Sequence, residues 1–173
     1  GKPYGVYADV DRLIVTDTGI GKAMVFDKKN KKFFAIGTEG QGLLYKPIGV
    51  IADKEGNIYV SDVQQDRVVV FDKEGKYSHV IGEKGAFIQP TGLATNDAIG
   101  VIYIVDTNKH QLFIYKKDGT PVSVVGRRGN GDGEFNFPTN VFVGKSGKVY
   151  VSDSMNFRVQ IFDPDGKFLK KFC

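Results

Sequence analysis

Residues 149–167 read Val-Tyr-Val-Ser-Asp-Ser-Met-Asn-Phe-Arg-Val-Gln-Ile-Phe-Asp-Pro-Asp-Gly-Lys. Two short apolar runs lie on either side of a polar segment that begins at Asp153. In the second run, Arg158–Phe162, polar and apolar residues alternate, which is the period of two typical of a β-strand. The stretch therefore predicts two strands joined by a polar loop, followed by a turn over residues 163–166 that ends in glycine.

The same pattern occurs four times along the chain. Pro3, Pro47, Pro90 and Pro138 each open one copy, and successive copies begin 43 to 48 residues apart. A regular period of this length indicates a repeat architecture. The copies cover about residues 3–46, 47–89, 90–137 and 138–173.

Each copy contains four apolar runs of four to six residues, and the second run ends in an aspartate. The turns at 53–56, 72–75 and 163–166 end in a glycine suited to a positive φ, as in a type I turn with a G1 bulge. No segment has a helical period. We therefore expect an all-β protein in which each copy is a four-stranded antiparallel sheet. Radial stacking of such sheets gives a β-propeller, and a flat solenoid is the competing architecture.

Composition sets wide bounds on function. The chain has 173 residues, with 22 Gly, 13 Phe, 8 Tyr and no Trp, and a formal net charge of +4. This charge permits an acidic partner without requiring one. Cys173 is the only cysteine, so no internal disulfide is expected, although oxidation could link two copies. No apolar run approaches the ~18 residues of a membrane helix, so no membrane insertion is expected.

The second copy carries the clearest family resemblance. Residues 56–62, Gly-Asn-Ile-Tyr-Val-Ser-Asp, and residues 66–75, Asp-Arg-Val-Val-Val-Phe-Asp-Lys-Glu-Gly, resemble the NHL repeat. The lack of Trp argues against WD and kelch repeats. The resemblance implies relatives among bacterial six-bladed NHL-type propellers, many of them exported or lipid-anchored. It therefore favours an extracytoplasmic location over a cytoplasmic one.

Four copies are fewer than the six blades usual in that family. Either the chain forms a four-bladed ring, or it is a fragment of a larger ring of about six blades, and we expect the second. A fragment would expose apolar blade faces, and such faces drive association. We therefore also expect self-association through these faces.

The loops between the second and third strands share one rim of a propeller with the linkers between blades. An aspartate begins this loop in every copy. A ring of carboxylates around a site is one interpretation, but repetition in all copies favours a structural role in the turns. These structural aspartates are Asp17, Asp62, Asp106 and Asp153.

Rim residues that differ between copies are better binding candidates, because Arg, Asn and exposed aromatic side chains suit recognition of macromolecules. The candidate binding residues are Gln64, Gln65, Arg67, Asn108, Lys109, His110, Arg127, Arg128, Asn156, Phe157 and Arg158. We expect a noncatalytic scaffold that binds a protein or another macromolecule through this rim, with a protein favoured as the partner. An RNA-binding propeller and a metal-assisted lyase or hydrolase are the alternatives.

Enzyme chemistry finds little support in the sequence. His79 and His110 occupy different positions of the repeat, so no zinc site of three histidines can form. The glycine-rich linker 126–133 lacks the Gly-Lys-Ser/Thr and the helix of a phosphate-binding loop. Asp163 and Asp165 resemble the start of a calcium loop, but its other ligands are missing. We expect no cofactor, no metal and no catalytic residue.

Overall fold

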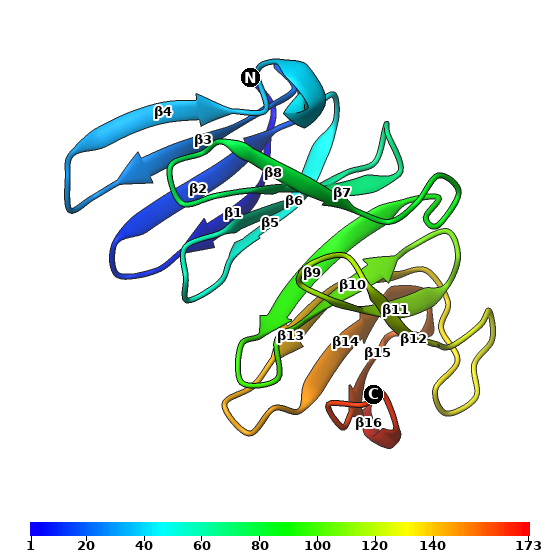
Figure 1. The fold of residues 1–173 in the computed structure, drawn as a ribbon. Coiled ribbons are helices and arrows are strands. Elements are labelled where there is room, and N and C mark those ends of the chain that lie inside the picture. The colour runs from blue at the N-terminus through cyan, green and yellow to red at the C-terminus, as the bar shows by residue number, and fades with distance from the viewer. The chain divides into compact units, whose positions relative to one another are not determined.

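The computed structural model describes residues 1–173 and contains sixteen β-strands and two 3-10 helices of three residues each (Figure 1). The strands form four separate antiparallel sheets, each made of four consecutive strands. We call these sheets blades 1 to 4. Their order confirms the expected all-β fold of four-stranded meanders. No helix has the length and apolar character needed to span a membrane.

The strand boundaries follow the four sequence copies closely. Blade 1 contains β1 (Pro3–Ala8), β2 (Arg12–Asp17), β3 (Lys22–Asp27) and β4 (Lys32–Ile36). Blade 2 contains β5 (Pro47–Ala52), β6 (Ile58–Asp62), β7 (Arg67–Phe71) and β8 (Tyr77–Ile81). Blade 3 contains β9 (Pro90–Asn96), β10 (Val101–Asp106), β11 (Gln111–Lys116) and β12 (Pro121–Val125). Blade 4 contains β13 (Pro138–Val143), β14 (Val149–Asp153), β15 (Arg158–Phe162) and β16 (Phe168–Phe172). The 3-10 helices are η1 (Gly40–Gly42) and η2 (Ser154–Asn156).

The hairpin turns have the conformation that their glycines predict. Gly56, Gly75 and Gly166 have φ values of 94°, 86° and 89°. Each glycine donates its backbone N–H to the carbonyl of the aspartate three residues earlier, at 2.9–3.0 Å. A side chain would be strained at these positive φ angles. The turn chemistry therefore fixes the register of the strands that it joins.

The chain divides into two compact parts, Gly1–Ala86 and Phe87–Cys173, which we call the N-terminal and C-terminal halves. The N-terminal half holds blades 1 and 2. One face of blade 1 packs against one face of blade 2, and the buried side chains between them form the core of this half. The core includes Ile14, Val25, Ile36, Val50, Ile58, Val60 and Phe71.

The C-terminal half holds blades 3 and 4, which pack in the same way. Its core includes Tyr103, Leu112, Ile114, Val149, Val151 and Phe162, and it also takes in Phe135 from the linker before β13. The inner strands β9 and β13 approach closely at Gly92. A Cβ there would lie 2.7 Å from Asn140 Cα and from the Thr139 carbonyl oxygen. Glycine therefore lets the two strands come together.

Candidate binding surface

Asp62 and Asp106 each connect two backbone segments at the beginning of a blade. Asp62 accepts backbone N–H groups from Tyr45 at 2.7 Å, Lys46 at 3.1 Å and Gln64 at 3.0 Å. Asp106 accepts the corresponding groups from Ile88, Gln89 and Lys109 at 2.7, 3.1 and 2.9 Å. Both residues are fully buried. Each carboxylate thus joins the linker that enters a blade to the loop between its second and third strands.

The other two repeat aspartates vary this arrangement. Asp17 accepts the N–H groups of Lys2 at 2.6 Å and Gly19 at 2.8 Å, and the Lys2 bond is the main cause of a lowered Asp17 pKa. Asp153 accepts Asn136 N–H at 2.7 Å and also three side chains of its own blade. These side-chain donors are Asn156, Arg158 and Gln160. All four carboxylates therefore have hydrogen-bond donors within their own blade.

Arg158, a binding candidate from the sequence, is not available to a partner. Its side chain is buried, and its Nε donates to Asp153 at 2.7 Å. The guanidinium also donates to the carbonyl oxygens of Asn130, Gly131 and Glu134 at 2.8–2.9 Å. The structure corrects the expectation for this residue, because the preceding linker folds over Arg158 and uses its donors.

The three candidates in the N-terminal half have different environments. Gln64 is exposed, whereas Gln65 and Arg67 are partly buried. Arg67 Nη2 donates to the carbonyl oxygens of Gln41 and Leu43 at 3.1 and 3.2 Å. Arg67 therefore donates hydrogen bonds to the linker before blade 2, as Arg158 does to the linker before blade 4. Gln64 is the exposed candidate in this half.

The candidates of the C-terminal half come together on three connected segments. Phe137 N–H donates to His110 Nδ1 at 3.0 Å, which joins the linker 126–137 to the β10–β11 loop. Met155 N–H donates to the Asn136 carbonyl at 3.0 Å, and Asn156 Nδ2 donates to the Gly129 carbonyl at 2.9 Å. These bonds join the linker to the β14–β15 loop. We call this surface the C-terminal rim surface and define it by Asn108, Arg128, Phe137, Met155 and Phe157.

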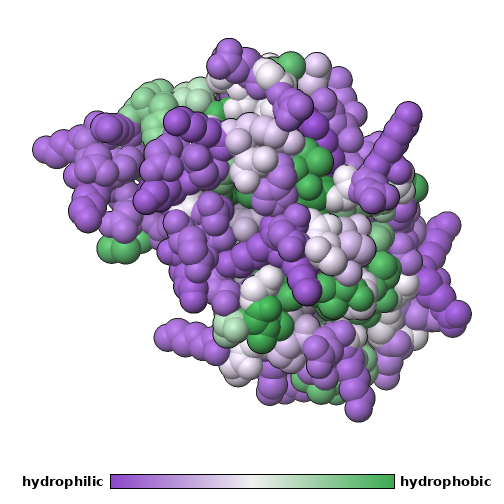
Figure 2. Space-filling view, viewed as in Figure 1, coloured by the Kyte–Doolittle hydropathy of each residue, from purple (hydrophilic) through white to green (hydrophobic).

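Apolar and cationic groups are exposed on this surface. Phe157 is 83% exposed and Met155 is 55% exposed. Arg128 is exposed as well. Arg127 is 80% exposed at its side chain but pairs with Glu134 at 2.8 Å. Sequence reasoning missed Phe137 and Met155, although Met155 lies in the same polar loop as Phe157. Figure 2 shows, on the face that it draws, hydrophobic patches that interrupt a largely hydrophilic surface.

The backbone explains how Phe157 is presented. Phe157 has a φ of 52°, and the residues at the same position of the other blades, Gly21, Asp66 and His110, also have positive φ values. This left-handed conformation belongs to the blade design and costs about 1 kcal/mol or more for a residue other than glycine. In blade 4 it projects a phenyl ring into solvent. The core therefore gains little from this ring, which is available for contact with a partner.

The buried His110 contacts Phe137 of the C-terminal rim surface. It is buried, and its ring lies 4.5 Å from the ring of Phe137 in an edge-on arrangement. Burial lowers the His110 pKa, and the nearby positive charge of Arg128 lowers it further. A neutral imidazole can accept the Phe137 N–H at Nδ1. Its neighbour Lys109 lies 5.6 Å above the Phe113 ring.

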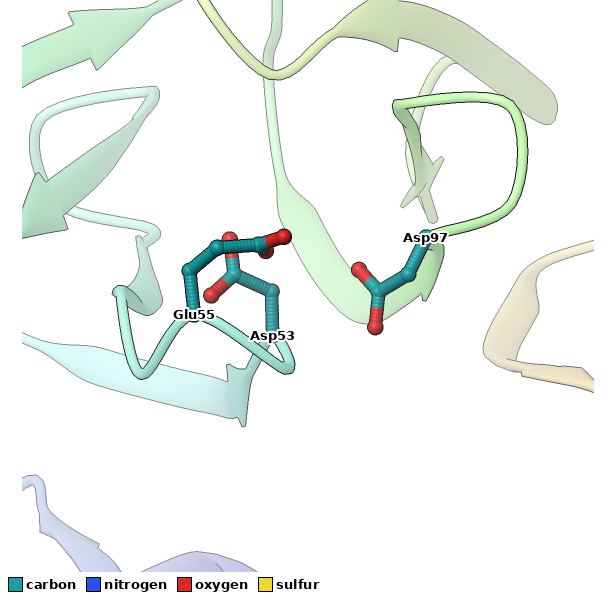
Figure 3. A group of neighbouring side chains, drawn as sticks. All are labelled: Asp53, Glu55 and Asp97. Carbon is teal, nitrogen blue, oxygen red and sulfur yellow. The ribbon is translucent and has the colours of Figure 1, made fainter.

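Figure 3 labels three carboxylates of the hairpin turns: Asp53 and Glu55 between β5 and β6, and Asp97 after β9. Within the N-terminal half, Asp53 accepts Asn57 N–H at 2.9 Å and the Tyr59 hydroxyl at 3.0 Å. Within the C-terminal half, Asp97 pairs with Lys117. Asp53 and Asp97 thus both have partners in their own half.

Comparisons with known proteins agree with the repeat architecture. Residues 94–172 match a family described as 6-bladed beta-propeller. Protein lin-41 of Caenorhabditis elegans is 51% identical over 43 residues, which are 25% of this chain and 4% of that protein. The chain therefore spans only a small part of this curated relative.

Solved structures match over almost the whole chain. A streptogramin B lyase has a TM-score of 0.79 at 16% identity and covers 98% of this chain and 54% of its own. Kuenenia stuttgartiensis hydrazine synthase has a TM-score of 0.77 at 14% identity, with 98% and 48% covered. A nidogen/laminin complex gives 0.62 at 17% identity, with 98% and 79% covered. Such identities show a shared fold and leave activity open.

The resemblance expected from the sequence is therefore confirmed at the level of fold. The matched family, the structural matches and the four four-stranded antiparallel sheets all point to one architecture. The chain is an NHL-like β-propeller repeat protein, and its four blades are of the six-bladed propeller type.

Proposed function

We propose that this chain is a noncatalytic binding platform whose C-terminal rim surface holds a protein partner. The observation that carries the proposal is the exposure of Phe157, Met155 and Arg128 on two loops that the Asn156–Gly129 hydrogen bond joins. Aromatic residues, Met and Arg are enriched in protein interfaces and supply much of the binding energy there. The corresponding partner is a segment with an apolar anchor and acidic side chains.

The rim loops also support the proposal through their rigidity. Asp153, Asn156 and Arg158 hold the β14–β15 loop and the linker 126–137 by at least six hydrogen bonds. A preorganised surface loses less conformational entropy on binding than a flexible one. The functional residues thus sit on loops that the buried polar network has already ordered.

Selection from a phage-displayed random peptide library tests this function. We expect the immobilised chain to enrich acidic peptides that contain a large apolar residue, and the enrichment to fall at least tenfold in Arg128→Glu and Phe157→Asn. Asn tolerates a positive φ, so the second variant should fold normally. Lys145→Glu and Ile99→Asn are matched controls in the C-terminal half, since both residues are exposed on other turns.

Two results would contradict the proposal. One is no enrichment, or enrichment that the rim variants leave unchanged. The other is tight binding of single-stranded RNA at low salt that weakens steeply as salt is added, which would favour the RNA-binding alternative. The formal net charge of +4 is low for nucleic-acid binding and supports the protein partner.

A further inference from the structure

The linkers that enter blades 2 and 3 are held by carboxylates. In blade 2, the N–H groups of Tyr45 and Lys46 both donate to Asp62, at 2.7 and 3.1 Å. Blade 3 repeats this arrangement with Asp106. In both blades the second donor is the residue immediately before the proline that opens the blade. One carboxylate and two backbone N–H groups thus fix the entry into each of these blades.

In blade 4 the aspartate makes only the first of these two bonds. Asn136 N–H donates to Asp153 Oδ1 at 2.7 Å, whereas Phe137 N–H donates to His110 Nδ1 at 3.0 Å. The second oxygen of Asp153 instead accepts side-chain donors of blade 4, among them Arg158 Nε at 2.7 Å. At this linker, an imidazole of the preceding blade therefore replaces the carboxylate as the second acceptor.

The backbone of Phe137 depends on this bond. Phe137 has a φ of 50°, whereas Lys46 and Gln89, at the same position of the other two linkers, do not have a positive φ. A left-handed conformation is unfavourable for a residue with a side chain, and a residue before a proline prefers an extended backbone. The Phe137 ring also packs edge-on against the His110 ring. His110 thus holds Phe137 in a strained conformation within the C-terminal rim surface.

Protonation would remove this support. An imidazole accepts a hydrogen bond only at an unprotonated ring nitrogen, so the bond to Nδ1 places the proton of neutral His110 on Nε2. In the imidazolium, Nδ1 carries a proton and faces the Phe137 N–H as a second donor. The Thr107 hydroxyl donates to the Pro138 carbonyl at 2.8 Å and does not titrate in this range. Phe137 can therefore be freed while the start of β13 stays attached.

We propose that protonation of His110 releases Phe137 and so lowers the affinity of the C-terminal rim surface for its partner. The loss of affinity rests on the proposed binding function, whereas the release of Phe137 depends on the fold alone. The carboxylate-held linkers before blades 2 and 3 have no imidazole acceptor at the corresponding position, so acid acts on the linker of blade 4.

Charged groups on three segments face His110. Arg128 of the linker opposes protonation, whereas Asp106 at the end of β10 and Asp153 at the end of β14 favour it. Burial has the largest effect, and the His110 pKa lies below its ordinary value of 6.5. The imidazole is therefore neutral at neutral pH and charged only in more acidic solution. The added charge would attract an acidic partner, but His110 is buried, so we expect the displacement of Phe137 to determine the affinity.

An NMR titration of the isotope-labelled 173-residue chain, from about pH 8 to about pH 4.5, tests the release. We expect the Phe137 amide signal to move with the midpoint of the His110 imidazole signals. The coupling between the Phe137 and His110 nitrogen nuclei through the hydrogen bond should disappear below this midpoint. The Lys46 amide, which donates to Asp62 at the same position of blade 2, is the control and should not follow it. A coupling that persists after His110 is protonated would overturn the proposal.

His110→Asn is the matched variant that cannot switch. Asn Oδ1 lies as many bonds from the backbone as His Nδ1, accepts a hydrogen bond throughout this pH range and tolerates a positive φ. Calorimetric titration uses an acidic peptide from the library selection, at about one pH unit above and below the measured His110 pKa. The dissociation constant of the wild type should rise about tenfold in acid, and that of His110→Asn much less. Equal rises in both chains would overturn the regulation.

Failure of the switch and failure of the binding function give different results. If no peptide binds at either pH, the proposed function is wrong, and the Phe137 amide still decides whether the release occurs. If the peptide binds and Phe137 keeps its bond to protonated His110, the proposed function stands and the switch is overturned. Cooperative thermal unfolding of both chains at the lower pH checks that they remain folded.

Discussion

Asp62 shows how a single buried carboxylate can organise a blade. Its oxygens accept three backbone N–H groups, and the residue is fully buried. Asp62→Ala would leave these donors without a partner, so we predict a loss of about 3 kcal/mol in the free energy of unfolding. Urea unfolding measures the change. Glu39→Ala is the control, because exposed Glu39 makes no capping hydrogen bond. Equal effects of the two substitutions would contradict the structural role.

His110 makes the C-terminal half sensitive to acid. Burial and the charge of Arg128 lower its pKa in the folded chain, so the unfolded chain binds the proton more readily. The free energy of unfolding should therefore fall as the pH drops through about 6.5, and this decrease should end below the folded-state pKa. The His110→Asn variant, in which Asn accepts the positive φ, should lack this decrease.

The same residue gives a direct test of the charge at the rim. Removing the repulsion in Arg128→Gln should raise the His110 pKa toward its ordinary value, because Arg128 is the second cause of the shift after burial. An NMR titration of the imidazole C–H signals measures the pKa. His79→Gln identifies the signal, since the chain has two histidines. An unchanged His110 pKa would place Arg128 away from the ring.

At the scale of elements, close strand approach depends on glycine in the inner strands. A Cβ at Gly92 would lie 2.7 Å from backbone atoms of residues 139 and 140, which cannot move independently of β13. We predict that Gly92→Ala lowers the free energy of unfolding by about 2 kcal/mol. Gly144→Ala is the matched control, because a Cβ there would approach the Tyr150 side chain at 3.2 Å and would lie at an ordinary contact distance of 3.8 Å from the Lys148 carbonyl oxygen. A smaller effect at Gly92 than at Gly144 would contradict this packing.

Strands and turns could be read from the sequence because their signals are local. Alternating residues and Asp-x-x-Gly turns predict four strands in each copy, and all four blades have them. The hydrogen-bond partners of each rim arginine could not be predicted in this way. Arg67 and Arg158 occupy the same repeat position, yet only Arg158 reaches its blade's aspartate. The difference depends on how the preceding linker folds, and this is a tertiary property.

The linker 126–137 is the clearest example of that limit. Its glycines indicate a loop, but nothing local predicts the bridge between Arg128 and Phe135 or the burial of Phe135 in the core. These contacts bring the carbonyl oxygens of residues 130, 131 and 134 onto Arg158. They also leave Arg128 exposed beside the β14–β15 loop. The sequence therefore predicted the rim as the candidate binding surface. It could not show which rim arginines are buried in structural contacts and which are exposed.

At the scale of the whole molecule, buried polar groups have a structural role, and the residues exposed on the rim loops are free to differ between blades. The repeat aspartates and Arg158 hold loops in place, and the residues that differ between blades cover the surface of those loops. If the proposed binding function holds, this division would let the protein keep its fold while the residues of its rim change. Binding specificity would then reside in few side chains, with Phe157, Met155 and Arg128 foremost.

Amide NMR mapping tests this central claim most directly. The isotope-labelled chain is titrated with an acidic peptide that contains a large apolar residue, enriched by the library selection. We predict that the largest chemical-shift changes fall in residues 106–111, 126–137 and 153–158, and that Phe157→Asn weakens the binding. Changes concentrated instead on the hairpin turns at 53–57 or 96–101 would contradict the account.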